Sequence, residues 1–146
     1  MIPRYRAWIS EADTMTNDLK GIDFENETVV LKKFYWEDGF PVEEEVFEVE
    51  IGNAIIMQST GLVDKNGKEI FEGDVVSRNS GMPSVVKFGK WIYEEDFGYK
   101  IKNIGFHLNS SYDDDEWFQA MDYEDIRKNY EVIGNIYENL ELLEDK

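Results

Sequence analysis

Few side chains in this sequence could act as a nucleophile or as a general base. Its 146 residues include one histidine and no cysteine, which excludes a thiolate nucleophile, a disulfide and a zinc site built on cysteines. His107 could form a Ser–His–Asp triad with Ser59, Ser77 or Ser110, but no serine lies in a Gly-x-Ser-x-Gly sequence. Because this histidine stands between two apolar residues, we predict that its role is structural.

Carboxylates are the other groups that could do chemistry, by binding a metal ion. The most acidic run is Asp113–Glu116. Adjacent carboxylates point to opposite faces of a strand and repel one another in a loop, so we predict a solvated loop there. Asp64–Gly67 resembles the start of a calcium loop, but its glycine comes too early and Lys68 occupies a ligand position. We therefore assign no catalytic, cofactor-binding or metal-binding residue, and no cofactor.

The charge balance indicates what kind of partner the chain prefers. There are 32 acidic residues against 15 basic ones, a net charge of −17. Such a surface repels phosphate groups, so we predict no direct contact with nucleic acid or with an anionic membrane. It favours basic partners over acidic ones, but we interpret the charge first as what keeps a small, aromatic-rich chain in solution. Glu43–Glu45, Glu48 and Glu50 form a second acidic stretch, which we interpret as a solvated edge strand. The alternative is a surface that mimics nucleic acid.

Other enzyme classes leave few traces in the sequence. No phosphate-binding loop or dinucleotide-binding fingerprint is present. The many acids leave a hydrolase with paired carboxylates open as an alternative. Aromatic residues make up 14% of the chain, and we expect the tryptophans to build the core and any subunit interface rather than line a groove. The tryptophans are Trp8, Trp36, Trp91 and Trp117.

The elements that must position these residues are mostly strands. Alternating apolar and polar residues predict strands, and Asp122 followed by acids and then bases predicts a short helix. Asn66-Gly67 predicts a two-residue type I′ hairpin turn, and Gly89 is expected to separate two short strands. The expected elements are strands at Tyr5–Ile9, Thr28–Trp36, Phe47–Ile51, Ala54–Gln58, Ser84–Phe88, Lys90–Tyr93 and Val132–Ile136, one strand or a pair of strands over Tyr99–Ile104 and Phe106–Leu108, a helix at Asp122–Lys128 and a last helical turn at Glu138–Glu144.

These elements predict a mainly β fold of short, strongly bent antiparallel strands. A small SH3-like or similar barrel is expected, with one short helix late in the chain and a single domain over residues 1–146. No apolar stretch follows the basic start, and none reaches the ~18 residues of a membrane span. We therefore expect a cytoplasmic protein. An unpaired sheet edge would also favour a homo-oligomer.

Three blocks of the sequence resemble the YopX family of phage and prophage proteins. They are Pro3–Trp8, Met57–Val76 and Tyr130–Asn139, in the family's order and spanning nearly the whole chain. The resemblance implies a largely β, cytoplasmic protein made from a phage or prophage gene, with no assigned activity and no catalytic residues to carry over. Leu140 stands where members of the family often have proline. Residues 77–125 match no block of the family, so any function special to this chain would lie there.

Three functional hypotheses follow. The first is a non-enzymatic phage or prophage accessory protein that acts by protein–protein contact, as a homo-oligomer. The second is an acidic mimic of nucleic acid that binds a DNA-binding protein. The third is a metal-assisted hydrolase.

Overall fold

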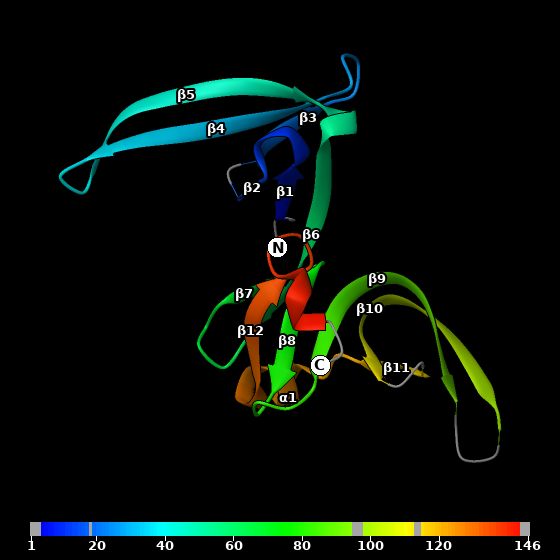
Figure 1. Cartoon of the computed structure of the whole chain (residues 1–146). Coiled ribbons are helices and arrows are strands. Elements are labelled where there is room, and N and C mark those ends of the chain that lie inside the picture. The colour runs from blue at the N-terminus through cyan, green and yellow to red at the C-terminus, as the bar shows by residue number, and fades with distance from the viewer. Residues whose placement is uncertain (1–3, 18, 95–97, 113–114, 144–146) are drawn as a thin grey trace. The chain divides into compact units, whose positions relative to one another are not determined.

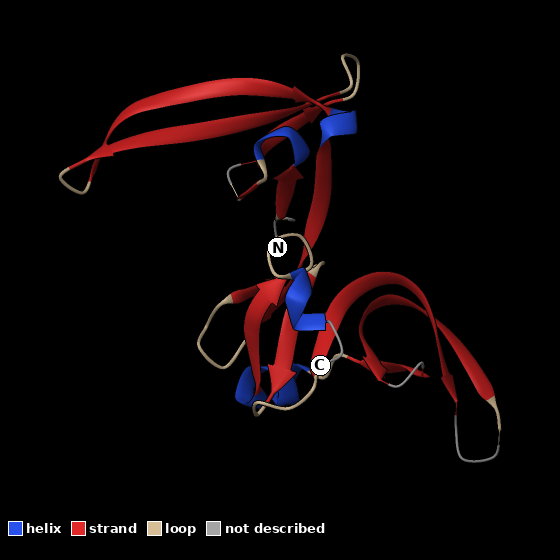
Figure 2. Ribbon diagram, viewed as in Figure 1, coloured by secondary structure: helices blue, strands red, loops and turns tan. Residues whose placement is uncertain are grey.

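The structure is a computed structural model, and it describes residues 4–17, 19–94, 98–112 and 115–143. Strands dominate, all sheet pairings are antiparallel, and one α-helix lies late in the described chain (Figure 2). This confirms the predicted mainly β class. The chain divides into two compact units, residues 1–58 and 59–146, with the boundary inside strand β6. The expectation of a single domain stays a prediction.

The strands and helices follow in this order along the chain (Figure 1): β1 (Tyr5–Ile9), η1 (Ser10–Ala12), β2 (Thr14–Thr16), β3 (Leu19–Asp23), β4 (Thr28–Glu37), β5 (Phe40–Glu50), η2 (Ile51–Asn53), β6 (Ala54–Val63), β7 (Glu69–Phe71), β8 (Asp74–Arg78), β9 (Pro83–Glu94), β10 (Lys100–Tyr112), β11 (Asp115–Ala120), α1 (Tyr123–Asn129), β12 (Tyr130–Asn135) and η3 (Leu140–Leu143). The three elements labelled η are 3₁₀ helices, and η3 lies within the predicted last helical turn at Glu138–Glu144.

The N-terminal unit packs two small sheets around one apolar cluster. In one sheet β1 pairs with β2 and with the first half of β6, and in the other β4 lies between β3 and β5. The cluster joins Ala7 and Ile9 of β1 to Val29 and Leu31 of β4, all buried. Because Val29 and Leu31 alternate with more exposed neighbours, only one face of the β4 sheet is covered.

The C-terminal unit is built on a five-stranded sheet with the order β11-β10-β9-β8-β12. One face of this sheet carries Val76, Val86 and Leu108, which pack against Ile126 of α1 and Tyr130. The helix begins as predicted, since the Asp122 carboxylate accepts a hydrogen bond of 3.0 Å from the Asp125 backbone N–H.

An ion pair fixes α1 to the end of β8. The guanidinium of Arg78 contacts the Asp125 carboxylate at 3.0–3.2 Å. This contact holds the pKa of Asp125 below its ordinary value, and the Asn129 amide adds to the effect.

Strands β9 and β10 are longer than predicted, and each bends instead of ending at a glycine. Gly89 and Gly105 face each other in the β9–β10 register, with φ of +146° and +149°. The expected break between two strands at Gly89 is wrong. The pairing continues through it, because glycine adopts this φ without the strain that a Cβ would cause. At this pair the hairpin curls into a half-barrel (Figure 1).

The hairpin at Asp64–Lys68 differs from the predicted type I′ turn. Only Gly67 has a positive φ, +79°, while the Gly67 N–H bonds to the Asp64 carbonyl and the Asp64 N–H to the Lys68 carbonyl. This is a three-residue loop closed by a glycine bulge. The predicted Asn-Gly geometry occurs elsewhere, at Asp38-Gly39, where both φ values are positive, +51° and +80°.

The buried carboxylate of Asp64 connects this hairpin to the last strand. One oxygen accepts the backbone N–H groups of Asn66 and Lys68, and the other accepts that of Val132, each at 2.9 Å. Asp64 is 2% exposed, so its carboxylate depends on these three donors in place of water. The carboxylate therefore has a structural role, in agreement with the rejection of a calcium loop.

We expect Asp64→Ala to destabilise the C-terminal unit by about 3 kcal/mol or more. The change removes the acceptor of three backbone N–H groups, and each hydrogen bond to a charged group contributes ~1.5–3 kcal/mol. Urea unfolding followed by circular dichroism measures the effect. Asp115→Ala, at an exposed strand position, should stay within ~0.5 kcal/mol of the parent. Equal effects of the two substitutions would contradict this role of Asp64.

Gly89→Ala and Gly105→Ala should each cost about 1–3 kcal/mol through backbone strain alone. No atom lies within 4 Å of the Cβ that either substitution would add, so a steric clash would not explain a loss. Gly52→Ala is the control, because its Cβ would also meet open space while its φ lies outside the left-handed range. Thermal unfolding of the three variants tests the prediction. It fails if Gly52→Ala lowers the midpoint as much as the other two.

Candidate interaction surface

Part of the β4–β5 hairpin extends beyond the sheet that anchors it. Strand β3 pairs only with Thr28–Leu31 of β4, so residues 32–47 form a two-stranded ribbon with no third strand among the described residues. We call residues 32–47 the arm, and Figure 1 shows it reaching away from β1, β2 and β3. A two-stranded ribbon is marginally stable on its own. The arm therefore needs either a partner or its own side-chain contacts to stay ordered.

The arm exposes large apolar side chains near its tip. Trp36 is 63% exposed, Phe40 72% and Val42 58%. Phe34 and Val46 are also exposed. Trp36 pairs with Pro41 and Phe40 with Glu37, so these two side chains lie on opposite faces of the tip. Several large apolar side chains exposed on one short ribbon are typical of an interaction site.

One face of the arm combines aromatic rings with an ion pair. The rings of Phe34 and Trp36 lie 6.2 Å apart, and the Lys32 ammonium lies 5.0 Å from the centre of the Phe34 ring. Lys32 also contacts the Glu44 carboxylate at 3.0 Å. These contacts order the side chains while leaving the aromatic surface open to a partner.

The other face is held by a hydrogen bond between the two strands. The Tyr35 hydroxyl donates to Glu45 Oε2 at 2.8 Å. This bond to a carboxylate favours the protonated phenol and raises the pKa of Tyr35 above its ordinary value. Each face of the arm thus has its own contact between the strands.

The acidic stretch at Glu43–Glu45, Glu48 and Glu50 lies on β5, an edge strand of its sheet, as predicted. All five glutamates are exposed, and none forms part of the buried cluster of the N-terminal unit. Along a strand they divide between two faces, with Glu43 and Glu45 opposite to Glu44 and Glu48. Strand β5 therefore offers no single acidic face of the kind that the mimic hypothesis requires.

His107 is buried, and its contacts are structural. Its ring stacks on Trp91 at 5.6 Å and lies 6.0 Å from Phe118, while Nδ1 is 3.1 Å from the Gly105 carbonyl. The three candidate serines bond elsewhere. Ser59 accepts from the Gly61 N–H, Ser77 donates to the Gly81 carbonyl, and Ser110 pairs with the Ser84 hydroxyl. The structure thus brings together no Ser–His pair among the residues it describes.

Two other predictions from the sequence need correction. Of the run Asp113–Glu116, residues 113–114 lie outside the described residues, and Asp115 and Glu116 begin β11 instead of lying in a loop. Trp91 is buried as predicted, but Trp36 and Trp117 are 63% and 61% exposed and do not belong to the core. The sequence pattern places Trp36 on a strand but does not show that the hairpin leaves its sheet there.

Two residues of the arm, Phe40 and Val42, were missed by reasoning from the sequence. The signal that could have found them is Asp38-Gly39, a dipeptide typical of two-residue hairpin turns, between two runs with apolar and aromatic residues. The tight turn brings Glu37 opposite Phe40 and extends β5 back to Phe40. The sequence pattern predicts a strand that starts only at Phe47.

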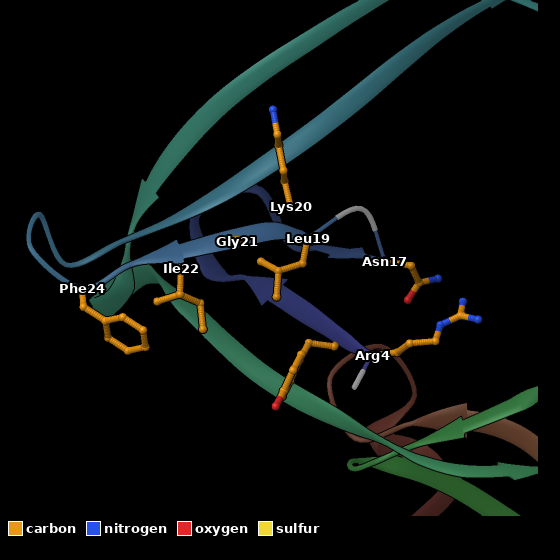
Figure 3. A pocket seen from close by; sticks show the side chains of 8 residues that line it. Arg4, Asn17, Leu19, Lys20, Gly21, Ile22 and Phe24 are labelled. Atoms are coloured by element: carbon orange, nitrogen blue, oxygen red, sulfur yellow. The ribbon is translucent and has the colours of Figure 1, made fainter. Parts of the chain in front are cut away.

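A groove in the same unit runs along β3. It has a volume of about 530 Å³ and combines the apolar side chains of Leu19, Ile22 and Phe24 with Arg4 and Asn17 (Figure 3). Lys20 points away from the other labelled side chains. The groove is open and its phenylalanine is 84% exposed, so it is a surface depression rather than an enclosed pocket.

Within the described ranges, no three His, Asp or Glu side chains gather closely enough to hold a metal ion. No helix in the described chain is long and apolar enough to span a membrane.

These features define a mainly antiparallel β protein with a curled sheet, a projecting hairpin and one late helix. The chain belongs to the YopX family, because the family described as "YopX protein" matches residues 4–144. It is also similar to the crystal structure of protein EF1440 from Enterococcus faecalis, with 28% sequence identity, 99% of each chain covered and a TM-score of 0.54. A comparison with curated proteins found no match. The predicted resemblance is confirmed, and family membership assigns no biochemical activity.

Proposed function

We propose that this protein is a non-catalytic accessory protein of phage or prophage origin that acts in the bacterial cytoplasm by binding another protein through the arm. The observation that carries the proposal is the exposed apolar tip of a ribbon that has no third strand among the described residues, with Trp36 and Phe40 both more than half exposed. Aromatic side chains of this kind are the usual anchors of protein interfaces. The family match is compatible with this role and does not specify it.

The charge of the arm indicates the chemistry of its partner. Residues 32–47 include five acidic residues and two lysines. A surface that fits them has an apolar centre flanked by lysine or arginine side chains. A second copy of this chain would bring the same excess of carboxylates to the contact. We therefore assign the arm to a different, basic protein, and self-association is the alternative that the experiment must separate.

The test uses a photo-crosslinking amino acid placed at Trp36 of the full chain in the bacterial host. Ile104, which is 74% exposed on the other unit, provides the control position. We expect one basic protein to be crosslinked from position 36 and not from position 104. Adducts made only of two copies of this chain would identify the arm as a self-association surface. No adduct from position 36 would contradict the proposal.

Binding of the purified partner then tests the anchors and the charge. Trp36→Ser with Phe40→Ser should weaken binding by about tenfold or more, since each is an exposed aromatic anchor. Ile104→Ser should leave binding unchanged. Affinity should also fall as salt is raised, because the carboxylates of the arm face basic groups. The assignment would be contradicted if the double variant bound the partner as tightly as the Ile104→Ser variant, or if the affinity did not depend on salt.

A further inference from the structure

The curled sheet of the C-terminal unit has a second face, opposite to the one that packs against α1. Val86 and Leu108, which pair across β9 and β10, point into the core. Their neighbours alternate to the opposite face, where Val85 pairs with Asn109 and Lys87 with His107. On β11 the same face carries Glu116 and Phe118, because they pair with Ser111 and Asn109.

The second face contains a hollow of about 370 Å³, which we call the β9–β11 hollow. Its polar lining consists of Lys87, Asn109, Ser111 and Glu116. Its apolar lining includes Val85 from the sheet and Leu140 and Leu143 from η3. Small-ligand sites typically enclose ~300–1,000 Å³ and combine an apolar wall with a few polar groups. The hollow therefore suits a ligand at the small end of that range.

The polar groups of the hollow have no partners within the described part of the chain. Asn109 is 6% exposed, and its Nδ2 is buried without a hydrogen-bond acceptor. Lys87, Ser111 and Glu116 take part in no side-chain hydrogen bond or ion pair among those residues. A buried amide without a partner costs ~1–3 kcal/mol, so its presence at the lining of a hollow points to a ligand that satisfies it.

The order of these groups across the sheet indicates the form of the ligand. Lys87 lies on β9, Asn109 on the central strand β10, and Glu116 on β11. Lys87 pairs with His107 and Glu116 with Ser111, so the two residues lie on a diagonal through Asn109, with Cα atoms about 16 Å apart. Side chains as long as those of Lys and Glu can bring their charged groups within the ~7–10 Å of two to three extended residues. A cation, an amide and an anion in that order match the carboxylate, the peptide group and the ammonium of a short peptide.

We propose that the β9–β11 hollow binds a short peptide with both ends free and an apolar side chain. Lys87 binds its carboxylate, the Asn109 amide bonds to its peptide group, and Glu116 binds its amino group. The apolar side chain packs against Val85, Leu140 and Leu143. The proposal is independent of the arm, which belongs to the N-terminal unit.

The test titrates the full chain with the dipeptide Leu-Leu and follows the side-chain amide signal of Asn109 by NMR. Three related probes each remove one feature: Leu-Leu-amide lacks the carboxylate, N-acetyl-Leu-Leu lacks the amino group, and Gly-Gly lacks the apolar side chains. We expect a saturable shift with Leu-Leu and an affinity lower by about fivefold or more for each of the other probes.

Paired substitutions connect each probe to one residue. Lys87→Ala should weaken binding of Leu-Leu about fivefold and leave the weaker binding of Leu-Leu-amide unchanged. Glu116→Gln should likewise weaken binding of Leu-Leu about fivefold and leave the weaker binding of N-acetyl-Leu-Leu unchanged. The matched controls are Lys102→Ala, on the opposite face of the same hairpin, and Asp115→Asn, next to Glu116 on β11. Both controls should bind Leu-Leu like the parent.

Three results would overturn the proposal. The first is a titration with Leu-Leu that does not saturate at millimolar concentration. The second is an equal response to Gly-Gly, which would show that the hollow does not recognise an apolar side chain. The third is an equal effect of Lys87→Ala and Lys102→Ala, which would show that the charge of the whole chain, rather than the hollow, sets the affinity.

Discussion

A buried carboxylate needs hydrogen-bond donors, and in the C-terminal unit three backbone N–H groups supply them to Asp64. Asp64 binds the N–H groups of Asn66 and Lys68 in its own hairpin and that of Val132 in β12. The Lys65 N–H bonds to the Tyr130 carbonyl beside it. The hairpin and the last strand are far apart in the sequence, and these bonds fix them to each other. Two of the three blocks that resemble the YopX family, Met57–Val76 and Tyr130–Asn139, are therefore joined through Asp64.

The other strands of the same sheet are shaped by a different feature. Strands β9 and β10 curl at the facing pair Gly89 and Gly105, so the sheet has a core face and a second face with its own hollow. The core face packs against Ile126 of α1 and against Tyr130, the first residue of β12. In the N-terminal unit the exposed feature is the arm. Its two strands continue past the point where β3 stops pairing with β4.

Local chemistry made several elements predictable from the sequence. The Asp122 cap, the strand Tyr5–Ile9 and the acidic edge strand all depend on residues close in the chain. The arm and the hollow were not predictable, because they depend on where a neighbouring strand ends and on which strands share a face. Asn66-Gly67 illustrates the limit. This dipeptide predicts a type I′ turn. The N–H groups of Asn66 and Lys68 instead donate to the Asp64 carboxylate, which favours a three-residue loop.

Amide hydrogen exchange of the native protein tests most directly whether Asp64 joins the hairpin to β12. If it does, the Val132 amide should exchange as slowly as core amides such as that of Val86, and Asp64→Asn should accelerate Val132, Asn66 and Lys68 together while changing Val86 much less. Fast exchange at Val132 in the parent protein would contradict the account. So would an Asp64→Asn variant in which Val132 keeps its protection.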